Sequence, residues 1–433
     1  MSNSINNTAK VLVSNESSTL IDNKTTTNEV ISRAGWFAII VAALGYFVDV
    51  FDMFLFANFR VASLTALGLS PEQVTTVGAS LVNWQLSGLL VGGFIWGIIG
   101  DKKGRSSVMF GSIFLYSTAT LLNAFVTTVE QYTILRFIAG IGLAGEIGAG
   151  ITLVSELLPK SKRGLGTTIV ATFGVSGAVA VGVVAKLVDW QMGYIVGGIM
   201  GLCLLALRVL VHESGIYEKT KHDTTVKKGS LLTIFGSFKL LLTYLSCIAI
   251  GTPIIVMSIL LATFAPEIAA AIGIQEKVTV PTVLIFGGTG ITIGDVLAGV
   301  LSQKMKSRKL PIFLLISSAL IVATVLLSGL ITTANGYNWA VGIYGLASGF
   351  WACLITTTAE QFGTNIRATA TTTIPNLIRG CGILMTSSFI ALKAYGFSAH
   401  TSISITIGTV FICALMGLYY IKETFHTDLD FND

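Results

Sequence analysis

Asp49 and Asp52 lie within a long apolar stretch of the chain that spans about residues 35–60. Because they are three residues apart, they lie on one face of a helix. A carboxylate in apolar surroundings prefers to be neutral, whereas a nearby arginine favours its ionised form. A change in those surroundings can therefore make the group bind or release a proton. Ionisable residues inside membrane-spanning segments are costly and usually functional, so this pattern indicates proton transfer.

A second apolar segment, residues 131–157, carries Arg136 and Glu146. With a rise of about 1.5 Å per residue, Asp49 and Asp52 lie about 20 and 24 Å into a hydrocarbon core of about 30 Å. The second segment enters from the opposite face, so Arg136, about 8 Å below that face, lies at nearly the same level, and Glu146 lies about 22 Å below it. We predict that these four residues form the proton-coupling set, with one aspartate as the proton site and Arg136 as its tuner. The alternative is a static pair that holds two helices together.

Arg379 falls near the middle of another apolar segment, residues 368–394, and follows Pro375. An unpaired arginine at that depth would be expensive, so it should meet a carboxylate. That carboxylate belongs either to the substrate or to the protein, and Asp295 is the protein partner that the sequence suggests.

Four further side chains are candidates for substrate contact. The amides of Asn83 and Gln85 lie in the second apolar segment and need a polar neighbour or a cavity. Tyr344 and Trp351 lie in the tenth segment and could stack on a polar ring, although ordinary packing is the alternative for both.

Membrane-spanning helices are the elements that must position these residues. Hydrophobic residues make up 53% of the 433 and charged residues 11%, against about 25% charged residues in a soluble domain. Lipid offers no hydrogen bonds to a bare backbone, so spans of this length should be helices. We therefore predict an all-α membrane protein with twelve transmembrane helices. The apolar blocks cover residues 35–60, 76–99, 107–127, 131–157, 165–188, 191–211, 238–265, 281–302, 310–331, 338–359, 368–394 and 399–421.

A repeat of charged residues divides the chain into two similar halves. Glu156 and Arg163 recur as Glu360 and Arg367, 204 residues further on. Such internal repeats are common in solute transporters, which bind substrate between the halves. The predicted organisation is a tail (1–33), a six-helix half (34–211), a loop between the halves (212–237), a second six-helix half (238–421) and a second tail (422–433).

The basic residues predict the orientation in the membrane. Most of the 27 Lys and Arg fall on one side of the predicted spans, and the opposite side carries Arg60, Lys186, Lys277 and Lys393. Cytoplasmic loops carry such an excess of basic residues, so both termini should be cytoplasmic and the chain should cross the plasma membrane many times. The net charge of +5 then reflects topology, and no nucleic-acid partner is expected.

The loop between the second and third spans carries a recognisable signature. It reads Gly97-Ile-Ile-Gly-Asp101-Lys-Lys-Gly104-Arg105 and resembles the signature loop of the major facilitator superfamily. A weaker copy after Gly299 has Gln303 where that family has aspartate. The resemblance implies twelve helices in two halves, with helices one, four, seven and ten around a central cavity. It also implies a cytoplasmic latch that does not touch substrate, with ordinary basic anchoring as the alternative. The latch residues are Gly97, Asp101, Gly104, Arg105, Glu156, Arg163, Glu360 and Arg367.

The segment from Glu156 to Gly164, E-x-x-P-x-x-x-R-G, is similar to one in the sugar-porter and metabolite:proton symporter branches, and Gly145-Glu146 resembles the latter. This resemblance implies proton-coupled uptake of an organic acid, an amino-acid-like compound or a sugar by alternating access. The fifth span lacks the G-x-x-x-G-P of exporters, which favours import. The alternatives are a proton antiporter that exports a metabolite or siderophore, and a non-transporting sensor.

No enzymatic role, cofactor or metal is expected. The four histidines lie outside the span centres, and no nucleophile, phosphate-binding or dinucleotide motif is present in the sequence. The expected partners are a small-molecule substrate, protons and the lipid bilayer, and the expected oligomeric state is a monomer.

Overall fold

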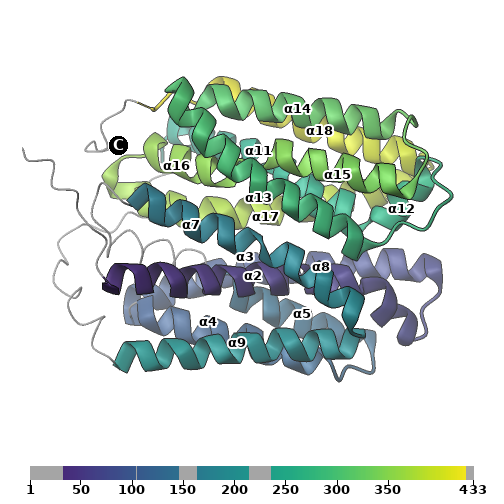
Figure 1. Cartoon of the computed structure of the whole chain (residues 1–433), viewed down its shortest axis with the longest axis horizontal. Coiled ribbons are helices and arrows are strands. Elements are labelled where there is room, and N and C mark those ends of the chain that lie inside the picture. The colour runs from purple at the N-terminus through teal and green to yellow at the C-terminus, as the bar shows by residue number, and fades with distance from the viewer. Residues whose placement is uncertain (1–32, 104, 146–162, 214–235, 426–433) are drawn as a thin grey trace, which may run out of the picture.

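The computed structural model describes residues 33–103, 105–145, 163–213 and 236–425 (Figure 1). Every regular element in this part of the chain is a helix, which confirms the all-α prediction. The first half contains α2 (Arg33–Ala66), α3 (Pro71–Lys103), α4 (Arg105–Asn123), α5 (Val129–Leu143), α7 (Arg163–Val175), α8 (Gly177–Leu187) and α9 (Trp190–Glu213). The second contains α11 (Phe238–Ile255), η2 (Val256–Thr263), α12 (Ala265–Ala271), α13 (Val280–Met305), α14 (Lys309–Leu327), α15 (Ala334–Ser348), α16 (Trp351–Gln361), α17 (Thr364–Ala394) and α18 (Ala399–Tyr420).

These helices follow the apolar segments of the sequence. Within the described residues, 10 helical stretches are long and apolar enough to cross a membrane, and Ser107–Asn123 is a shorter apolar helix. Several predicted spans consist of two helices in line: α7 with α8, α11 with η2, and α15 with α16. Helix α5 covers the described part of the predicted fourth span. The arrangement is consistent with twelve transmembrane helices.

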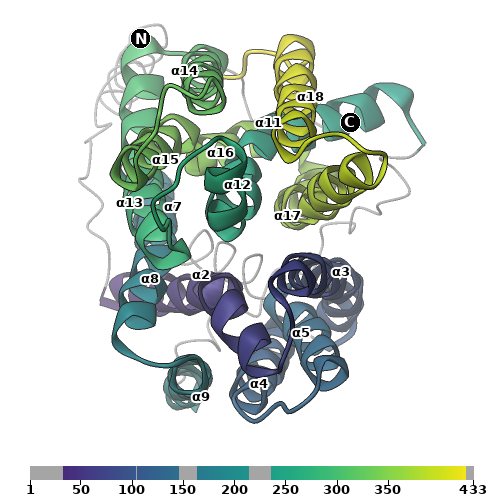
Figure 2. The same ribbon diagram turned by 90° about the vertical axis from the view of Figure 1, so that its right-hand side faces the viewer.

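The helices form two groups that pack side by side, α2–α9 in one and α11–α18 in the other (Figure 2). Helix α3 packs against α17 across the boundary, and α7 and α8 pack against α13. Since each of these contacts joins the halves, the boundary between them is a helix interface with side chains from both repeats.

Glycines at matching positions bring helices into close contact within each half. A Cβ on Gly88 of α3 would lie 2.1 Å from the carbonyl oxygen of Phe137 on α5. In the second half, 202 residues later, a Cβ on Gly290 of α13 would lie 2.1 Å from the carbonyl oxygen of Gly342 on α15. Small residues of this kind allow membrane helices to approach backbone to backbone. The two halves therefore repeat the same packing device.

The tenth span is interrupted between α15 and α16, and a buried carboxylate stabilises the break. Asp295 of α13 accepts a hydrogen bond of 2.9 Å from the backbone N–H of Ala352 in the first turn of α16. A carboxylate at a helix N-terminus satisfies donors that have no partner inside the helix. The hydrogen bond of Asp295 therefore lies within the second half.

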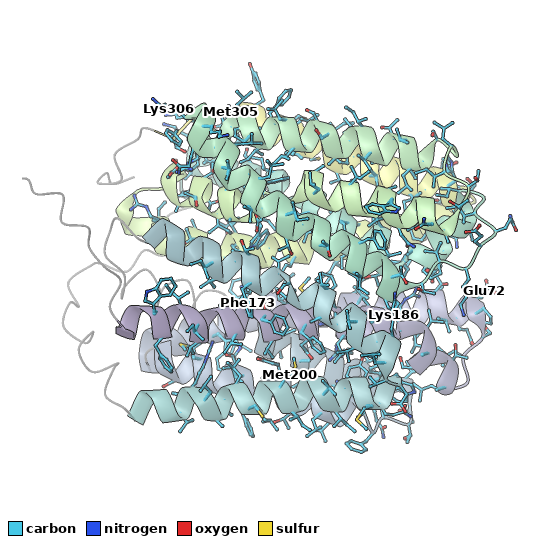
Figure 3. The ribbon with its side chains drawn as sticks, viewed as in Figure 1. Glu72, Phe173, Lys186, Met200, Met305 and Lys306 are labelled. Carbon is cyan, nitrogen blue, oxygen red and sulfur yellow. The ribbon has the colours of Figure 1, made fainter. Side chains whose placement is uncertain are left out.

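The two ends of the bundle differ in the elements they carry. Lys306, which directly follows α13, and the beginning of α2 lie at one end, which is called the basic end below; Glu72 and Lys186 lie at the opposite end (Figures 1 and 3). Helix α2 runs from the basic end toward the opposite end, as does α17.

Candidate functional site

Asp52 and Arg136, which the spacing placed at nearly the same depth, come together in the interior of the first half. Both side chains are buried, and they interact electrostatically. The Thr120 hydroxyl of α4 donates a 2.5 Å hydrogen bond to Asp52 Oδ1. Asp52 Oδ2 has no hydrogen-bond partner among the described residues. One carboxylate oxygen is therefore fixed by a hydrogen bond, and the other has no described hydrogen bond that a proton would disrupt.

The Arg136 guanidinium is buried without a hydrogen bond to any described residue, because Nε, Nη1 and Nη2 all lack a partner there. It lies over the ring of Tyr194 of α9, 5.3 Å from the ring centroid, in a cation–π contact. The Tyr194 hydroxyl bonds that of Tyr132 at 2.6 Å, which in turn bonds Ser63. No pattern in the sequence singled out these tyrosines, since they resemble ordinary aromatic core residues.

Asp49 takes a different partner from Asp52. Its Oδ2 lies 3.2 Å from Nη2 and 3.3 Å from Nη1 of Arg379 on α17. The exposed fractions are 0% for Asp49 and 4% for Arg379. The expectation that Arg379 meets a carboxylate is correct, but the suggested partner Asp295 is wrong, because that side chain caps α16. This ion pair joins the two halves inside the bundle.

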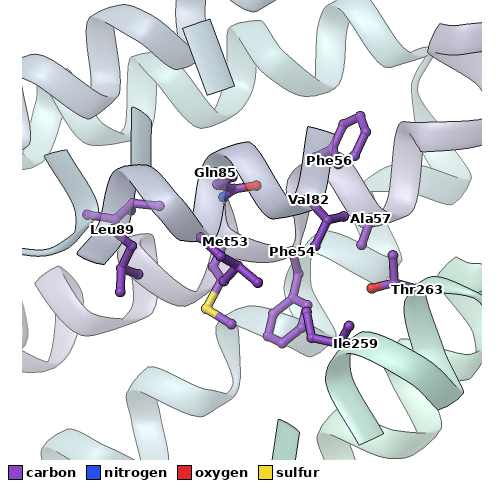
Figure 4. Close-up of a pocket in the computed structure, with 11 residues that line it drawn as sticks. Met53, Phe54, Phe56, Ala57, Val82, Gln85, Leu89, Ile259 and Thr263 are labelled. Carbon is purple, nitrogen blue, oxygen red and sulfur yellow. The ribbon is translucent and has the colours of Figure 1, made fainter. Parts of the chain in front are cut away.

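A small cavity lies between the halves (Figure 4). Its lining on α2 begins at Met53, which is one turn beyond Asp49 and directly follows Asp52. Phe54 of α2 and Ile259 of η2 flank it from opposite halves (Figure 4). Its polar lining consists of Gln85 and Thr263. The full lining is Met53, Phe54, Phe56, Ala57, Val82, Gln85, Leu86, Leu89, Leu143, Ile259 and Thr263. The cavity therefore offers mainly apolar surface.

The other candidate contact residues have separate positions. Asn83 faces the second half, where its Oδ1 accepts a hydrogen bond from the Thr386 hydroxyl and its amide donates to Ser387 at 3.4 Å. The buried Tyr344 hydroxyl donates to the carbonyl oxygen of Pro253 at 2.9 Å. Trp351 is buried at the start of α16. Of the four, only Gln85 lines the cavity.

A second ion pair joins the halves at the end opposite the basic end. Arg60 Nη2 lies 2.7 Å from Glu267 Oε1 on α12 and 3.1 Å from the Thr263 carbonyl oxygen. The Thr75 hydroxyl also donates to Glu267, at 3.2 Å. The sequence suggested only a charge at the membrane surface for Arg60, yet α2 continues to Ala66 and the side chain is fully buried.

The predicted latch residues are described only in part. Glu360 pairs with Arg308 through two bonds of 2.8 and 3.0 Å, and Arg367 Nε donates to the carbonyl oxygens of Ala359 and Phe362. These contacts all lie within the second half. Gly104, Glu146 and Glu156 lie outside the described residues. Gly97, Asp101, Arg105 and Arg163 have helical backbones, but the described part of the structure does not extend to their side chains.

Glu423, shortly after the end of α18, contacts the loop that precedes α14. Glu423 accepts hydrogen bonds from the Ser307 hydroxyl and from the backbone N–H groups of Arg308, Lys309 and Phe425. Burial raises the pKa of this carboxyl, but the hydrogen bonds outweigh it and lower the pKa to about 2. Glu423 is therefore an ionised cap on the N-terminus of α14.

Comparison with known proteins agrees with this architecture. The sequence model of the Major Facilitator Superfamily matches residues 42–387. A protein of Haemophilus influenzae named "Putative metabolite transport protein" is 30% identical over 380 residues, which cover 82% of this chain and 88% of that protein. The "Putative niacin/nicotinamide transporter NiaP" of Bacillus subtilis is 31% identical over 182 residues, which cover 41% of this chain and 44% of the relative.

Among solved structures, a crystal structure of a D-xylose-proton symporter superposes with a TM-score of 0.66 at 19% identity. The match covers 90% of this chain and 98% of the symporter, so the two share one fold over nearly their whole length. The matched family, the related metabolite transport protein and the shared fold lead to one conclusion: the chain is a multi-pass membrane transporter that belongs to the major facilitator superfamily.

Proposed function

We propose that this transporter couples the uptake of a small organic acid to protons, by alternating access between its two halves. The observation that carries this proposal is the pairing of two buried aspartates on one face of α2 with two buried arginines. Asp49 contacts Arg379 of the second half, and Asp52 interacts with Arg136 of the first. A rearrangement of the halves changes the charge and solvent around both carboxylates, and such a change alters proton affinity.

The first half supplies an environment in which a proton can move. Asp52 keeps one hydrogen-bond donor, Thr120, while Arg136 contributes a charge that no described hydrogen bond satisfies. Removing a proton from either aspartate creates a negative charge that Arg136 or Arg379 can stabilise. Glu146 retains its predicted role as a further member of this set.

The cavity lining favours an organic acid over a sugar. A sugar carries many hydroxyls, and each would lose its hydrogen bonds to water on entering a mostly apolar site. An acid with an apolar body loses little there and needs only a few polar contacts, such as the Gln85 amide. The name of the Bacillus subtilis relative, a niacin/nicotinamide transporter, agrees with a substrate of this size.

Substrate contacts are proposed for Gln85, Asn83 and Arg379, which lie at the boundary between the halves. Tyr344 and Trp351 are assigned to packing, because the Tyr344 hydroxyl donates a hydrogen bond to the Pro253 carbonyl oxygen and Trp351 is buried at the start of α16.

The basic end is proposed to face the cytoplasm, with both termini there and the chain in the plasma membrane. The predicted latch residues are proposed to hold the halves together in one state of the cycle.

The test uses the purified full chain in proteoliposomes with an imposed pH gradient and radiolabelled benzoate and nicotinate. At least one of the variants Asp49→Asn and Asp52→Asn is expected to lose accumulation against a gradient, because it lacks the proton site, while exchange of internal for external substrate continues. Glu72→Gln, an exposed carboxylate in the first turn of α3, is the control and should accumulate like the wild type. Full proton-driven accumulation in both aspartate variants would reject the proposal.

A further inference from the structure

The Asp49–Arg379 contact is a buried ion pair with an incomplete geometry. Both terminal nitrogens of Arg379 approach the same oxygen, Asp49 Oδ2, at 3.2 and 3.3 Å. At the basic end, Arg308 instead meets both oxygens of Glu360, at 2.8 and 3.0 Å. Arginine binds carboxylates most strongly through two parallel bonds of this second kind. Asp49 therefore does not form the two parallel hydrogen bonds that the Arg379 guanidinium can make with a carboxylate.

The pair lies next to the cavity along both of its helices. Met53, which lines the cavity, is one turn beyond Asp49 on α2. On α17, Gly382 lies one turn beyond Arg379, and a Cβ there would contact Leu86 and Ile259, two other lining residues. Because both helices run from the basic end, the ion pair lies one turn from Met53 and Gly382 on the side of the basic end, although neither of its two residues lines the cavity.

We propose that Arg379 is the binding site for the carboxylate of the substrate, and that Asp49 occupies this site only while it is empty. The inference rests on the proposed function and deepens it. An incoming carboxylate makes two parallel bonds to the guanidinium and displaces Asp49. The apolar body of the substrate then lies in the cavity beside Met53 and Leu86, and Asp49 takes up one proton.

The need for the buried site to remain neutral determines how many protons accompany each substrate anion. The empty site contains one negative and one positive charge, Asp49 and Arg379. After displacement, the substrate carboxylate neutralises Arg379, so an ionised Asp49 would leave a net buried charge, which is costly. One proton therefore accompanies each monovalent anion, and transport carries no net charge.

The neighbouring ionisable groups have contacts of their own. Tyr46, one turn before Asp49, interacts with Arg379 through its hydroxyl. Asp295 of α13 caps α16, and Asp52 is bonded to Thr120 beside Arg136. Among the groups around Arg379, Asp49 is the carboxylate that loses its cation when substrate binds.

Binding is tested with matched acids and amides, benzoate with benzamide and nicotinate with nicotinamide, on the purified full chain. The wild type is expected to bind each acid more tightly than its amide. Arg379→Gln should weaken acid binding about 10- to 100-fold, as expected for lost hydrogen bonds to a charged group, and leave amide binding unchanged. The affinity of Arg379→Lys for the acids should lie between those of the wild type and Arg379→Gln, because lysine keeps the positive charge but cannot form two parallel hydrogen bonds. Lys393→Gln removes a cation from the other end of α17 and should have no effect.

Retained acid binding in Arg379→Gln, or no preference of the wild type for either acid, would overturn the inference. Unchanged amide binding in the variant shows that the protein is folded. Asp49→Asn removes the competing carboxylate, so acid binding should persist in that variant but no longer take up a proton from a weakly buffered solution.

Stoichiometry is tested by imposing an inside-negative potassium diffusion potential on proteoliposomes with valinomycin. The accumulation ratio of benzoate is expected to stay the same with and without the potential, because no net charge moves. A rise in accumulation would mean more than one proton per anion and would overturn the inference while proton coupling stands. Failure of a pH gradient to drive any uptake would instead reject the proposed function.

Discussion

Asp49 and Asp52 share one face of α2 but interact with arginines from different halves, Asp49 with Arg379 and Asp52 with Arg136. Their depth and shared helical face follow from spacing alone, and the calculation that put Arg136 at the same level agrees with its interaction with Asp52. The choice of Arg379 as the partner of Asp49 could not be derived, because the two residues are 330 apart in the chain and meet only through the packing of the two halves. For the same reason, nothing in the sequence linked Arg60 to Glu267.

Glu423 carries the pH dependence that can be tested outside the membrane. Its pKa of about 2 lies below the ordinary value of 4.5, so its ionised form stabilises the fold at neutral pH. That contribution is complete above pH 4.5 and is lost as the pH falls through about 2. Glu423→Gln is therefore expected to lower the melting temperature in detergent at pH 7, and the difference from the wild type should shrink between pH 4.5 and 2.

The control for this measurement is Glu72→Gln at the opposite end of the bundle, where the carboxylate lies in the exposed first turn of α3. A difference between Glu423→Gln and the wild type that stays constant down to pH 2 would contradict the assignment of Glu423 as an ionised cap.

At the scale of helices, the apolar segments of the sequence predicted nearly every membrane-spanning helix, but they did not predict where a span is interrupted. The break between α15 and α16 and the π-helical η2 lie inside segments that read as continuous spans. The first is stabilised by Asp295 from another helix. The second follows Pro253, which disrupts the regular hydrogen bonding of α11. The first break depends on a contact with a neighbouring helix, so the pattern of a single segment does not contain it.

The glycine contacts between α3 and α5 give the prediction at this scale. A Cβ on Gly140 would lie 2.0 Å from the carbonyl oxygen of Gln85, so Gly140→Ala must push the two helices apart. It is expected to lower the free energy of unfolding by about 1–3 kcal/mol, the usual cost of overpacking. Unfolding in mixed micelles measures this change.

Gly299 provides the matched control, because a Cβ there would meet nothing within 4 Å. Gly299→Ala should be neutral or stabilise α13 by about 0.5–1 kcal/mol through helix propensity. Equal effects of the two substitutions would contradict the close approach of α3 and α5.

At the scale of the whole molecule, the halves are joined by two buried contacts on α2. Asp49–Arg379 and Arg60–Glu267 are 11 residues apart on that helix, about 16 Å, and the cavity lies between them. Both contacts pair residues from different halves. Under the proposed alternating access, the boundary between the halves opens toward each side in turn, so we expect each pair to break during the cycle.

Arg60→Gln is expected to loosen the end opposite the basic end, because it removes the cation that holds Glu267. The readout is the labelling rate of Ala57→Cys, a cavity-lining position, in a chain whose five native cysteines are replaced. A membrane-impermeant maleimide added outside should react several times faster in Arg60→Gln, and the charge-reversed pair Arg60→Glu/Glu267→Arg should restore slow labelling. Lys186→Gln, at the same end, is the control; equal rates in all variants would show that the ion pair does not close this end.

The direction of proton movement decides most directly between symport and antiport. A pH-sensitive dye enclosed in proteoliposomes reports the lumen when nicotinate is added outside, with protein-free liposomes correcting for diffusion of the neutral acid. The lumen is expected to acidify with the wild type beyond that background, and not with Asp49→Asn. Protein-dependent alkalinisation, or nicotinate uptake with no protein-dependent proton movement, would contradict proton-coupled uptake through the α2 aspartates.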